Sequence, residues 1–200
     1  MKAMLFSIII PAYNAADRIR AALDSVAKQT FKDYELIVVC DACEDDTAKI
    51  AREYTDKVFE VPYHNEGLAR NCGLDHAVGD WVLWIDDDDY WLHEYVLEQL
   101  SEQVPDQIDA LCFSFIFKGR GYAAPSGNRG CHWIAVWTKC WRRSFIGDTR
   151  FGTEVPCDVN FNVRMMKKRP RLRDWDMPLY YYNYMRPGST TWKLMKGVQV

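Results

Sequence analysis

The sequence predicts a single α/β domain with a mostly parallel sheet and helices on both faces. Its 200 residues suit one domain, and the hydrophobic fraction of 48% is enough to fill a core. The first hundred residues alternate short apolar, β-branched runs with amphipathic segments of helical period. Because crossovers through helices join parallel strands, this alternation predicts a Rossmann-like sheet covered on two sides.

Each element of the first half follows from a local pattern. The predicted strands are continuous apolar runs, as buried parallel strands usually are, and Pro11 closes the first of them. The helices carry apolar residues three and four positions apart; Asp45 or Asp46 can cap the second, and Gly79 ends the third. The strands are expected at residues 6–10, 35–40, 58–61 and 81–85, and the helices at 17–28, 45–54 and 66–78.

The second half is less regular. A glycine-rich stretch, residues 119–130, is expected to be a long functional loop. Around it the pattern predicts helices at residues 92–104, 137–145 and 158–168, and strands at 108–117 and 178–184. We see no internal repeat and no obvious second domain.

Composition argues against several classes of protein. The net charge is −3 and the pI is near 5.8, whereas a general nucleic-acid binder is usually strongly basic. No apolar run approaches the ~18 residues of a membrane span, and the run near the N-terminus is too short for a signal peptide. We therefore expect a cytoplasmic protein that does not bind nucleic acid.

The cysteines indicate reduced thiols rather than a disulfide framework. There are seven of them, an odd number, and they are scattered along the chain. Cys40 and Cys43 form a CxxC pair, but no second pair accompanies them to complete a zinc site. Ordinary free thiols are the expected state.

Polar segments follow three of the predicted strands. In such sheets the ligand lies at the carboxyl ends of the strands, which brings together residues 11–14, 41–47 and 86–89. The third segment consists of Asp86, Asp87, Asp88 and Asp89. Adjacent carboxylates repel unless a cation or several donors neutralise them, and Mg²⁺ or Mn²⁺ typically takes one or two carboxylates plus substrate phosphates. The alternative is a solvated turn whose aspartate caps the next helix.

Six segments, taken in order, resemble family 2 glycosyltransferases, which have the GT-A fold. SIIIPAYN (residues 7–14) is similar to the family's opening strand and nucleotide loop, VVCDACEDDT (38–47) to its VVDDGSxDxT segment, and NEGLARNCG (65–73) to its NxGxxxARNxG helix. WIDDDD (84–89) matches the hxDxDD metal motif, FGTE (151–154) with Cys157 and Asp158 resembles FxE…ED, and YYYNYMRPGSTT (180–191) resembles YYYRxRxGSxT. The resemblance covers residues 5–191, and six motifs in the right order carry far more weight than one.

The resemblance implies a role for each matched polar segment. Pro11, Ala12, Tyr13 and Asn14 would line the base and ribose pocket, and Asp41 would accept a hydrogen bond from a uracil-type ring nitrogen. Asp86 and Asp87 would contact the donor, and Arg70 would steady the aspartates or touch the diphosphate. A divalent cation, Mn²⁺ or Mg²⁺, would be held by Asp88 with Asp86, and Asp158 would be the catalytic base.

Simpler interpretations stay open for several of these side chains. Tyr13 can pack in its loop, Asp41 can bond its own turn, Arg70 can form a structural salt bridge, and Asp158 can cap a helix. The chain also departs from the family pattern: Cys40, Ala42 and Cys43 replace an aspartate, a glycine and a serine, and Cys157 replaces a glutamate. The QxxRW signature of the processive branch is absent, so we expect one sugar per encounter.

These features together predict an inverting glycosyltransferase. It would move a sugar from a nucleotide-diphosphate sugar, expected to be a UDP-sugar, to an acceptor hydroxyl in glycan or cell-surface polysaccharide synthesis. Residues 1–104 would form the donor half, ending in the aspartate motif, and residues 105–200 the acceptor half. The alternatives are a sugar-nucleotide nucleotidyltransferase and a catalytically silent nucleotide- or sugar-binding module.

The acceptor side is less defined than the donor side. A glycan or lipid-linked acceptor is expected from the resemblance. Residues 164–173, from Arg164 to Arg173, hold six basic side chains in ten positions. They form a solvated helix face, grip an acceptor phosphate, or contact the anionic inner face of a membrane. The sequence does not define the sugar, the acceptor or the oligomeric state.

Overall fold

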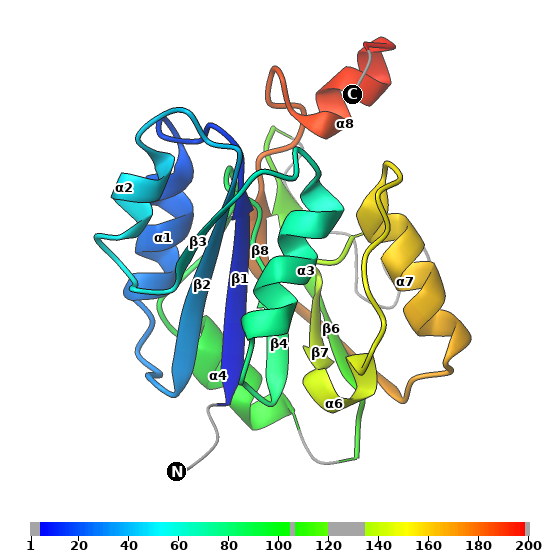
Figure 1. Cartoon of the computed structure of the whole chain (residues 1–200). Helices are drawn as coiled ribbons and strands as arrows, with labels where there is room; N and C mark the ends of the chain where they lie inside the picture. The colour runs from blue at the N-terminus through cyan, green and yellow to red at the C-terminus, as the bar shows by residue number, and fades with distance from the viewer. Residues whose placement is uncertain (1–4, 105–106, 120–134, 199–200) are drawn as a thin grey trace.

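The computed structural model describes residues 5–104, 107–119 and 135–198. One sheet runs through them, with helices on both of its faces (Figure 1). The strands are β1 (Phe6–Ala12), β2 (Tyr34–Asp41), β3 (Val58–Val61), β4 (Trp81–Trp84), β5 (Tyr90–Trp91), β6 (Ala110–Phe117), β7 (Lys139–Arg142) and β8 (Leu172–Tyr182). The helices are α1 (Ile19–Ala27), α2 (Thr47–Ala51), α3 (Glu66–His76), α4 (Val96–Gln103), α6 (Arg143–Ile146), α7 (Cys157–Lys167) and α8 (Thr190–Lys196).

The first half of the chain forms a parallel sheet. β1 lies between β2 and β4, and β3 pairs with β2, all of them parallel. The order β3-β2-β1-β4 is that of a Rossmann-like sheet. Every residue of β1 is buried, because helices cover both faces of the strand. The strands and helices predicted for this half are all present, although α2 is shorter than predicted.

Gly79 serves a close backbone approach instead of ending a helix. α3 stops at His76, before the glycine. A Cβ at position 79 would lie 2.6 Å from backbone atoms of Phe6 and Ser7, closer than side chains tolerate. The missing side chain therefore lets the turn after α3 pass against the start of β1.

Alternation along β1 divides the core into two layers. Ile8 and Ile10 belong to the layer that contains α1, α2 and α4, whereas Ile9 belongs to the layer with α3, α6 and α7. The carboxyl ends of β1 and β2 and the first turns of α3 and α7 lie at the same end of the domain (Figure 1, top). Polar groups from distant segments are therefore brought together at that end.

Two helices predicted for the second half need correction. Residues 137–145, expected to be helical, contain β7 and the single turn α6. In β7 the side chains of Cys140 and Trp141 enter opposite core layers, so the buried run is a central strand between β4 and β6. The helix expected at 92–104 starts only at Val96, because the Leu92 amide is still hydrogen bonded to the Leu179 carbonyl of β8 and a turn follows it. Most of the loop expected at 119–130 lies outside the described residues.

β8 is longer than the strand predicted at residues 178–184. It begins at Leu172, and its first residues are largely exposed, so they carry no buried-strand pattern. Parallel pairing with β6 extends the strand through these polar residues. The pairs β4–β7 and β5–β8 join residues of the two halves within one sheet, which confirms a single domain. The assignment of the halves to donor and acceptor remains a prediction.

A buried carboxylate fixes the end of the sheet opposite the strands' carboxyl ends. The Glu35 side chain is 3% exposed and accepts hydrogen bonds from the Val78 amide at 2.7 Å and the Gly79 amide at 3.3 Å. It also accepts from the Ser7 hydroxyl and pairs with Lys57. Burial disfavours the charged form, but the bonds from Lys57, Ser7 and Val78 outweigh it, so the pKa of Glu35 is lowered.

We predict that Glu35→Gln lowers the free energy of unfolding by about 1–3 kcal/mol at neutral pH, because a buried charged acceptor and the partner of Lys57 are lost. In the folded wild type the pKa lies below its unfolded value of ~4.3. The carboxylate's contribution is therefore complete above that value and disappears as the pH falls through the folded pKa. Urea unfolding of both proteins should show a gap in stability that narrows on acidification.

Glu53→Gln is the matched control. Glu53 pairs with Arg20 at the surface, and both side chains are 50% exposed. Exposed pairs contribute little to stability, so this variant should unfold almost as the wild type does. An equal decrease in the free energy of unfolding in the two variants would contradict the role given to Glu35.

Candidate active site

A pocket of about 950 Å³ opens at the carboxyl ends of the parallel strands. The three polar segments predicted to meet do meet there. Of the predicted site residues, those that line the pocket are Pro11, Ala12, Tyr13, Asp41, Arg70, Asp86, Asp87, Asp88 and Asp158. Asn14 does not line it; its side-chain oxygen accepts a hydrogen bond from the Glu44 amide at 2.8 Å and so joins the first two segments.

Asp89 is the structural member of the aspartate run. Its carboxylate is fully buried and accepts hydrogen bonds from the Tyr180 hydroxyl and the Asn183 amide, both at 2.7 Å. Burial raises the pKa of Asp89 well above its usual range, and the charges of Asp86 and Asp88 raise it further. Asp89 therefore ties the end of β4 to the end of β8.

Asp87 is paired with a cation at the N-cap position of α1. The Arg18 guanidinium donates to its two oxygens at 3.0 and 2.9 Å. The Tyr13 amide approaches the same carboxylate at 3.4 Å. Burial raises the pKa of Asp87 to about 6, with Arg18 acting in the opposite direction. The carboxylate thus holds the loop that carries Tyr13.

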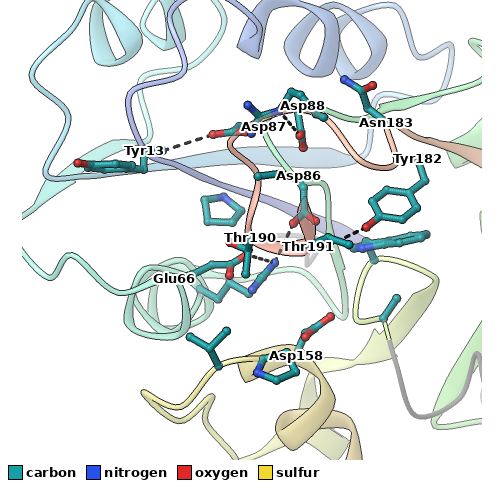
Figure 2. Close-up of a pocket in the computed structure, with 18 of the residues that line it drawn as sticks. Tyr13, Glu66, Asp86, Asp87, Asp88, Asp158, Tyr182, Asn183, Thr190 and Thr191 are labelled. Atoms are coloured by element: carbon teal, nitrogen blue, oxygen red, sulfur yellow. Dashed lines mark hydrogen bonds and ion pairs between the residues drawn. The ribbon is translucent and has the colours of Figure 1, made fainter. Parts of the chain in front are cut away.

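Asp86 shares a buried arginine with Glu66. Arg70 is 2% exposed, and its guanidinium lies 2.8 Å from Asp86 and 2.7 Å from Glu66 (Figure 2). Burial raises the pKa of Asp86 to about 7, although Arg70 opposes the shift. Arg70 is therefore a structural ion-pair partner that steadies the aspartates. Glu66 went unnoticed in the sequence; its position four residues before Arg70 was the available signal.

Asp88 faces an arginine from the C-terminal segment. The Arg186 Nε lies 2.5 Å from Asp88 Oδ2, and the two side chains are 25% and 12% exposed. Arg186 stands between β8 and α8 and also lines the pocket. Sequence reasoning gave it no role, although it lies within the closing motif YYYNYMRPGSTT.

Asp158 lies across the pocket from Asp88, on the first turn of α7 (Figure 2). The N-cap position of α7 is Pro156, so the interpretation of Asp158 as the cap is wrong. The Asp158 carboxylate accepts from the next amide, that of Val159, at 2.8 Å. Burial raises the pKa of Asp158, while the charge of Arg70 lowers it.

Asp41 is occupied by backbone donors. It is 4% exposed, and its oxygens accept from the amides of Tyr63, His64 and Asn65 at 2.7, 2.8 and 2.6 Å. These donors lie between β3 and α3, 22–24 residues along the chain, so the interpretation that Asp41 bonds its own turn is wrong. Recognition of the nucleotide base by the Asp41 carboxylate remains a prediction. Tyr13 is 54% exposed and lines the pocket, and the centroids of the Tyr13 and His64 rings lie 6.4 Å apart.

Aromatic side chains form the opposite wall. Trp137 stacks on Tyr180 with ring centroids 4.6 Å apart, and the Tyr182 hydroxyl lies 3.0 Å from that of Thr191. The aromatic residues that line the pocket here are Phe115, Phe117, Trp137, Tyr182 and Tyr184. α8 adds Thr190, Thr191, Lys193 and Leu194 at the rim. The wall combines apolar rings with hydroxyl groups, a surface suited to sugar rings.

The carboxylates fit a small hard cation. Within the described ranges, no cluster of three or more His, Cys, Asp or Glu side chains is arranged as a metal site. Mg²⁺ and Mn²⁺ usually bind one or two carboxylates and complete their shell with substrate phosphates and water. Asp86 and Asp88 both face the pocket and supply such a donor set. Arg186 offsets the charge of Asp88 here.

The basic run at residues 164–173 is divided among intramolecular contacts. Arg164 pairs with Glu154 at 3.3 Å, and the Arg171 Nη2 lies 2.8 Å from Asp109. The Lys168 ammonium donates to the carbonyls of Phe145 and Ile146, and Arg173 donates to that of Gln103. Membrane contact through this run remains a prediction, with fewer free charges than the sequence implied. None of the described helices is long and apolar enough to cross a bilayer.

The family model described as glycosyl transferase family 2 matches residues 7–167. Because that match spans most of the chain, the protein belongs to this family. Two relatives match over different lengths. EpsJ of Bacillus subtilis, an uncharacterised glycosyltransferase, is 29% identical over 94% of this chain and 63% of its own. WfaP of Escherichia coli, a UDP-Glc:α-D-GlcNAc-diphosphoundecaprenol β-1,3-glucosyltransferase, is 38% identical over 48% of this chain and 40% of its own.

A solved structure agrees with the sequence relatives. Residues 1–349 of S. aureus TarS in complex with UDP-GlcNAc superpose with a TM-score of 0.83 at 26% identity, covering 98% of this chain and 62% of that one. TarS is a poly(ribitol-phosphate) β-N-acetylglucosaminyltransferase. The fold is therefore GT-A. The chain spans less than two thirds of the length of each of these relatives.

We predict that Arg70→Met lowers the free energy of unfolding by about 3–5 kcal/mol in mildly alkaline buffer, because the carboxylate of Asp86 loses its buried partner. Without Arg70 the pKa of Asp86 rises further above its unfolded value. Protonation then relieves the buried charge, so the deficit should shrink toward about pH 5. Denaturant titrations at the two pH values measure both effects.

Arg150→Met is the control for Arg70→Met. Arg150 pairs with Asp75, and these side chains are 38% and 54% exposed. Its removal should cost no more than about 1 kcal/mol and show no such pH dependence. A mild, pH-independent effect of Arg70→Met would contradict the buried ion pair.

Proposed function

We propose that this chain transfers a sugar, with inversion, from a UDP-sugar to an acceptor hydroxyl in cell-surface polysaccharide or lipid-linked glycan synthesis. The observation that carries the proposal is the layout of one pocket. Asp86 and Asp88 lie on one side, Asp158 lies across from them, and an aromatic wall flanks the space between. Family membership, the UDP-GlcNAc complex of TarS and the polymer or lipid-diphosphate acceptors named for TarS and WfaP support it.

The donor occupies the edge formed by β1 and β2 in this proposal. Tyr13 offers an exposed ring to the nucleoside, and Asp41 together with the turn at Tyr63–Asn65 shapes the base pocket. The diphosphate lies toward Asp86 and Asp88. Arg186 and Lys193, both at the pocket rim, add positive charge for it.

A divalent cation held by Asp88 and Asp86 would neutralise charge on the diphosphate leaving group. The chain's own residues prepare that position. Arg70 and Glu66 hold the Asp86 carboxylate in place. Asp89 and Tyr180 fix the turn that presents Asp88. Arg186, on the segment before α8, pairs with Asp88 and limits the repulsion among the carboxylates.

Asp158 accepts the proton of the acceptor hydroxyl. A base works best when its pKa lies close to the operating pH, and burial shifts the pKa of Asp158 in that direction. Its position across the pocket from Asp86 and Asp88 suits in-line attack from the face opposite the leaving group. A single displacement of this kind inverts the anomeric centre.

The proposal is tested with a panel of nucleotide sugars, Mn²⁺ and candidate lipid-diphosphate or polyol-phosphate acceptors. We expect release of UDP that depends on acceptor and on one UDP-sugar. Nuclear magnetic resonance of the product should show the opposite anomer from the donor. Nucleotide binding without any UDP release would instead identify a silent binding module.

Asp158→Asn should reduce turnover by about 10²–10⁴-fold while UDP affinity stays near the wild-type value, because the amide keeps the shape but cannot accept the proton. The wild-type rate should fall as the pH drops through the raised pKa of Asp158. Steady-state kinetics and isothermal titration measure the two quantities. Asp148→Asn, a change at an exposed residue, is the control. Loss of UDP binding in Asp158→Asn would make the residue structural.

Asp88→Asn should weaken Mn²⁺ binding in the presence of UDP by at least tenfold, as measured by electron paramagnetic resonance titration, because one of two anionic ligands is lost. Turnover should fall with it, and chelation of the wild type should have the same effect. Asp17→Asn, at a side chain that is 81% exposed, should bind Mn²⁺ normally. Full turnover in chelator would exclude the cation.

A further inference from the structure

A pair of thiols lies behind the donor edge of the pocket. Cys40 is the penultimate residue of β2, and Cys43 follows the turn made by Asp41 and Ala42. Ala42, between them, has a φ of +51°, in the left-handed region. The Cys43 thiol lies 3.4 Å from the carbonyl oxygen of Ala12, the β1 residue that pairs with Cys40, and neither cysteine is in a disulfide. These are two of the positions at which the chain departs from the family pattern.

The two sulfurs differ in exposure and in acidity. Cys40 is 1% exposed, whereas Cys43 is partly exposed. The hydrogen bond from Cys40 lowers the pKa of Cys43, and a bond from the Asn14 amide assists it against the effect of burial. The pKa of Cys40 is raised by its bond with Cys43 and by burial. Cys43 is therefore the attacking thiol, and Cys40 is placed as its resolving partner.

We propose that Cys40 and Cys43 form a reversible disulfide that controls the donor edge of the pocket. The oxidant is a small-molecule disulfide such as oxidised glutathione. The Cys43 thiolate attacks one of its sulfurs, which forms a mixed disulfide and releases one glutathione thiolate. The Cys40 thiolate then attacks the Cys43 sulfur and releases the second. Two protein thiols are oxidised, one glutathione disulfide is reduced to two thiols, and the thiol protons pass to the released thiolates.

The link to the pocket runs through Cys43. Its thiol donates to the carbonyl oxygen of Ala12 at 3.4 Å, and the neighbouring Glu44 amide donates to the Asn14 side chain. A disulfide has no thiol proton, so the Ala12 carbonyl loses this donor. The Cys43 sulfur is also drawn toward Cys40. Because Ala12 lines the donor edge, oxidation should weaken nucleotide binding, a consequence that rests on the proposed donor site.

The chemical step is tested by mass. The full chain is equilibrated with mixtures of reduced and oxidised glutathione, quenched by alkylation and mapped by peptide mass spectrometry. In mixtures with a high ratio of oxidised to reduced glutathione, we expect the mass of the peptide that holds both cysteines to fall by two hydrogens. Treatment with dithiothreitol should restore them. Cys43→Ser should show no such loss, and Cys72→Ala, a change at a different buried thiol, should behave as the wild type. A stable glutathione adduct, or two free thiols throughout, would overturn the proposal.

The consequence is tested by titrating UDP into reduced and oxidised protein. We expect affinity to fall by about two- to tenfold on oxidation, the effect of roughly one lost hydrogen bond, and to return on reduction. The affinity of Cys43→Ser should not respond to oxidant. Equal affinity of the two forms would overturn control of the pocket. If reduced wild type binds no UDP, the proposed donor site fails, whereas the disulfide is still judged by mass.

Discussion

Four successive aspartates at the end of β4 are the constraint on which the rest of the site depends. Their carboxylates are largely removed from water, so each must be paired with a cation, hydrogen bonded or protonated. The partners come from segments far apart in the sequence: Arg18 at the N-cap of α1, Arg70 in α3 and Arg186 in the segment before α8. Neutralising the aspartates therefore also fixes where these segments meet and where the pocket opens.

The four aspartates differ in their partners and in whether they reach the pocket. Asp89 is hydrogen bonded to β8 and does not line the pocket, whereas Asp86, Asp87 and Asp88 line it and each pairs with an arginine. Asp158 has a raised pKa mainly because it is buried, with Arg70 limiting the shift. One arginine thus balances two carboxylates on different elements. In the proposed reaction, Arg70 therefore couples Asp86, near the leaving group, to Asp158, the base.

The departures from the family pattern rearrange contacts around the same groups. Cys157 stands where the pattern has a glutamate, and its sulfur lies 3.1 Å from Arg70. Burial raises the pKa of Cys157 to about 11, so it adds no charge, and Glu66 and Asp86 carry the pairing of Arg70. Cys40 and Cys43 leave a pair of thiols beside Asp41, whose three backbone bonds keep the donor turn in place. Arg70 and Asp41 therefore keep charged or backbone partners although residues beside them are replaced.

The sequence by itself determined the parallel half of the sheet and the place where its ligand lies, because apolar period and strand ends are local features. It also identified the segments that carry Asp41, Asp86, Asp88 and Asp158. The tertiary structure alone decided which neighbour each carboxylate has, because pairing with Arg70 or Arg186 joins residues far apart in the chain. It also decided that residues 139–142 form a strand, because hydrogen-bonded pairing with β4 and β6 overrides a local helical pattern. Charge compensation and sheet pairing are long-range properties, and no local pattern in the sequence encodes them.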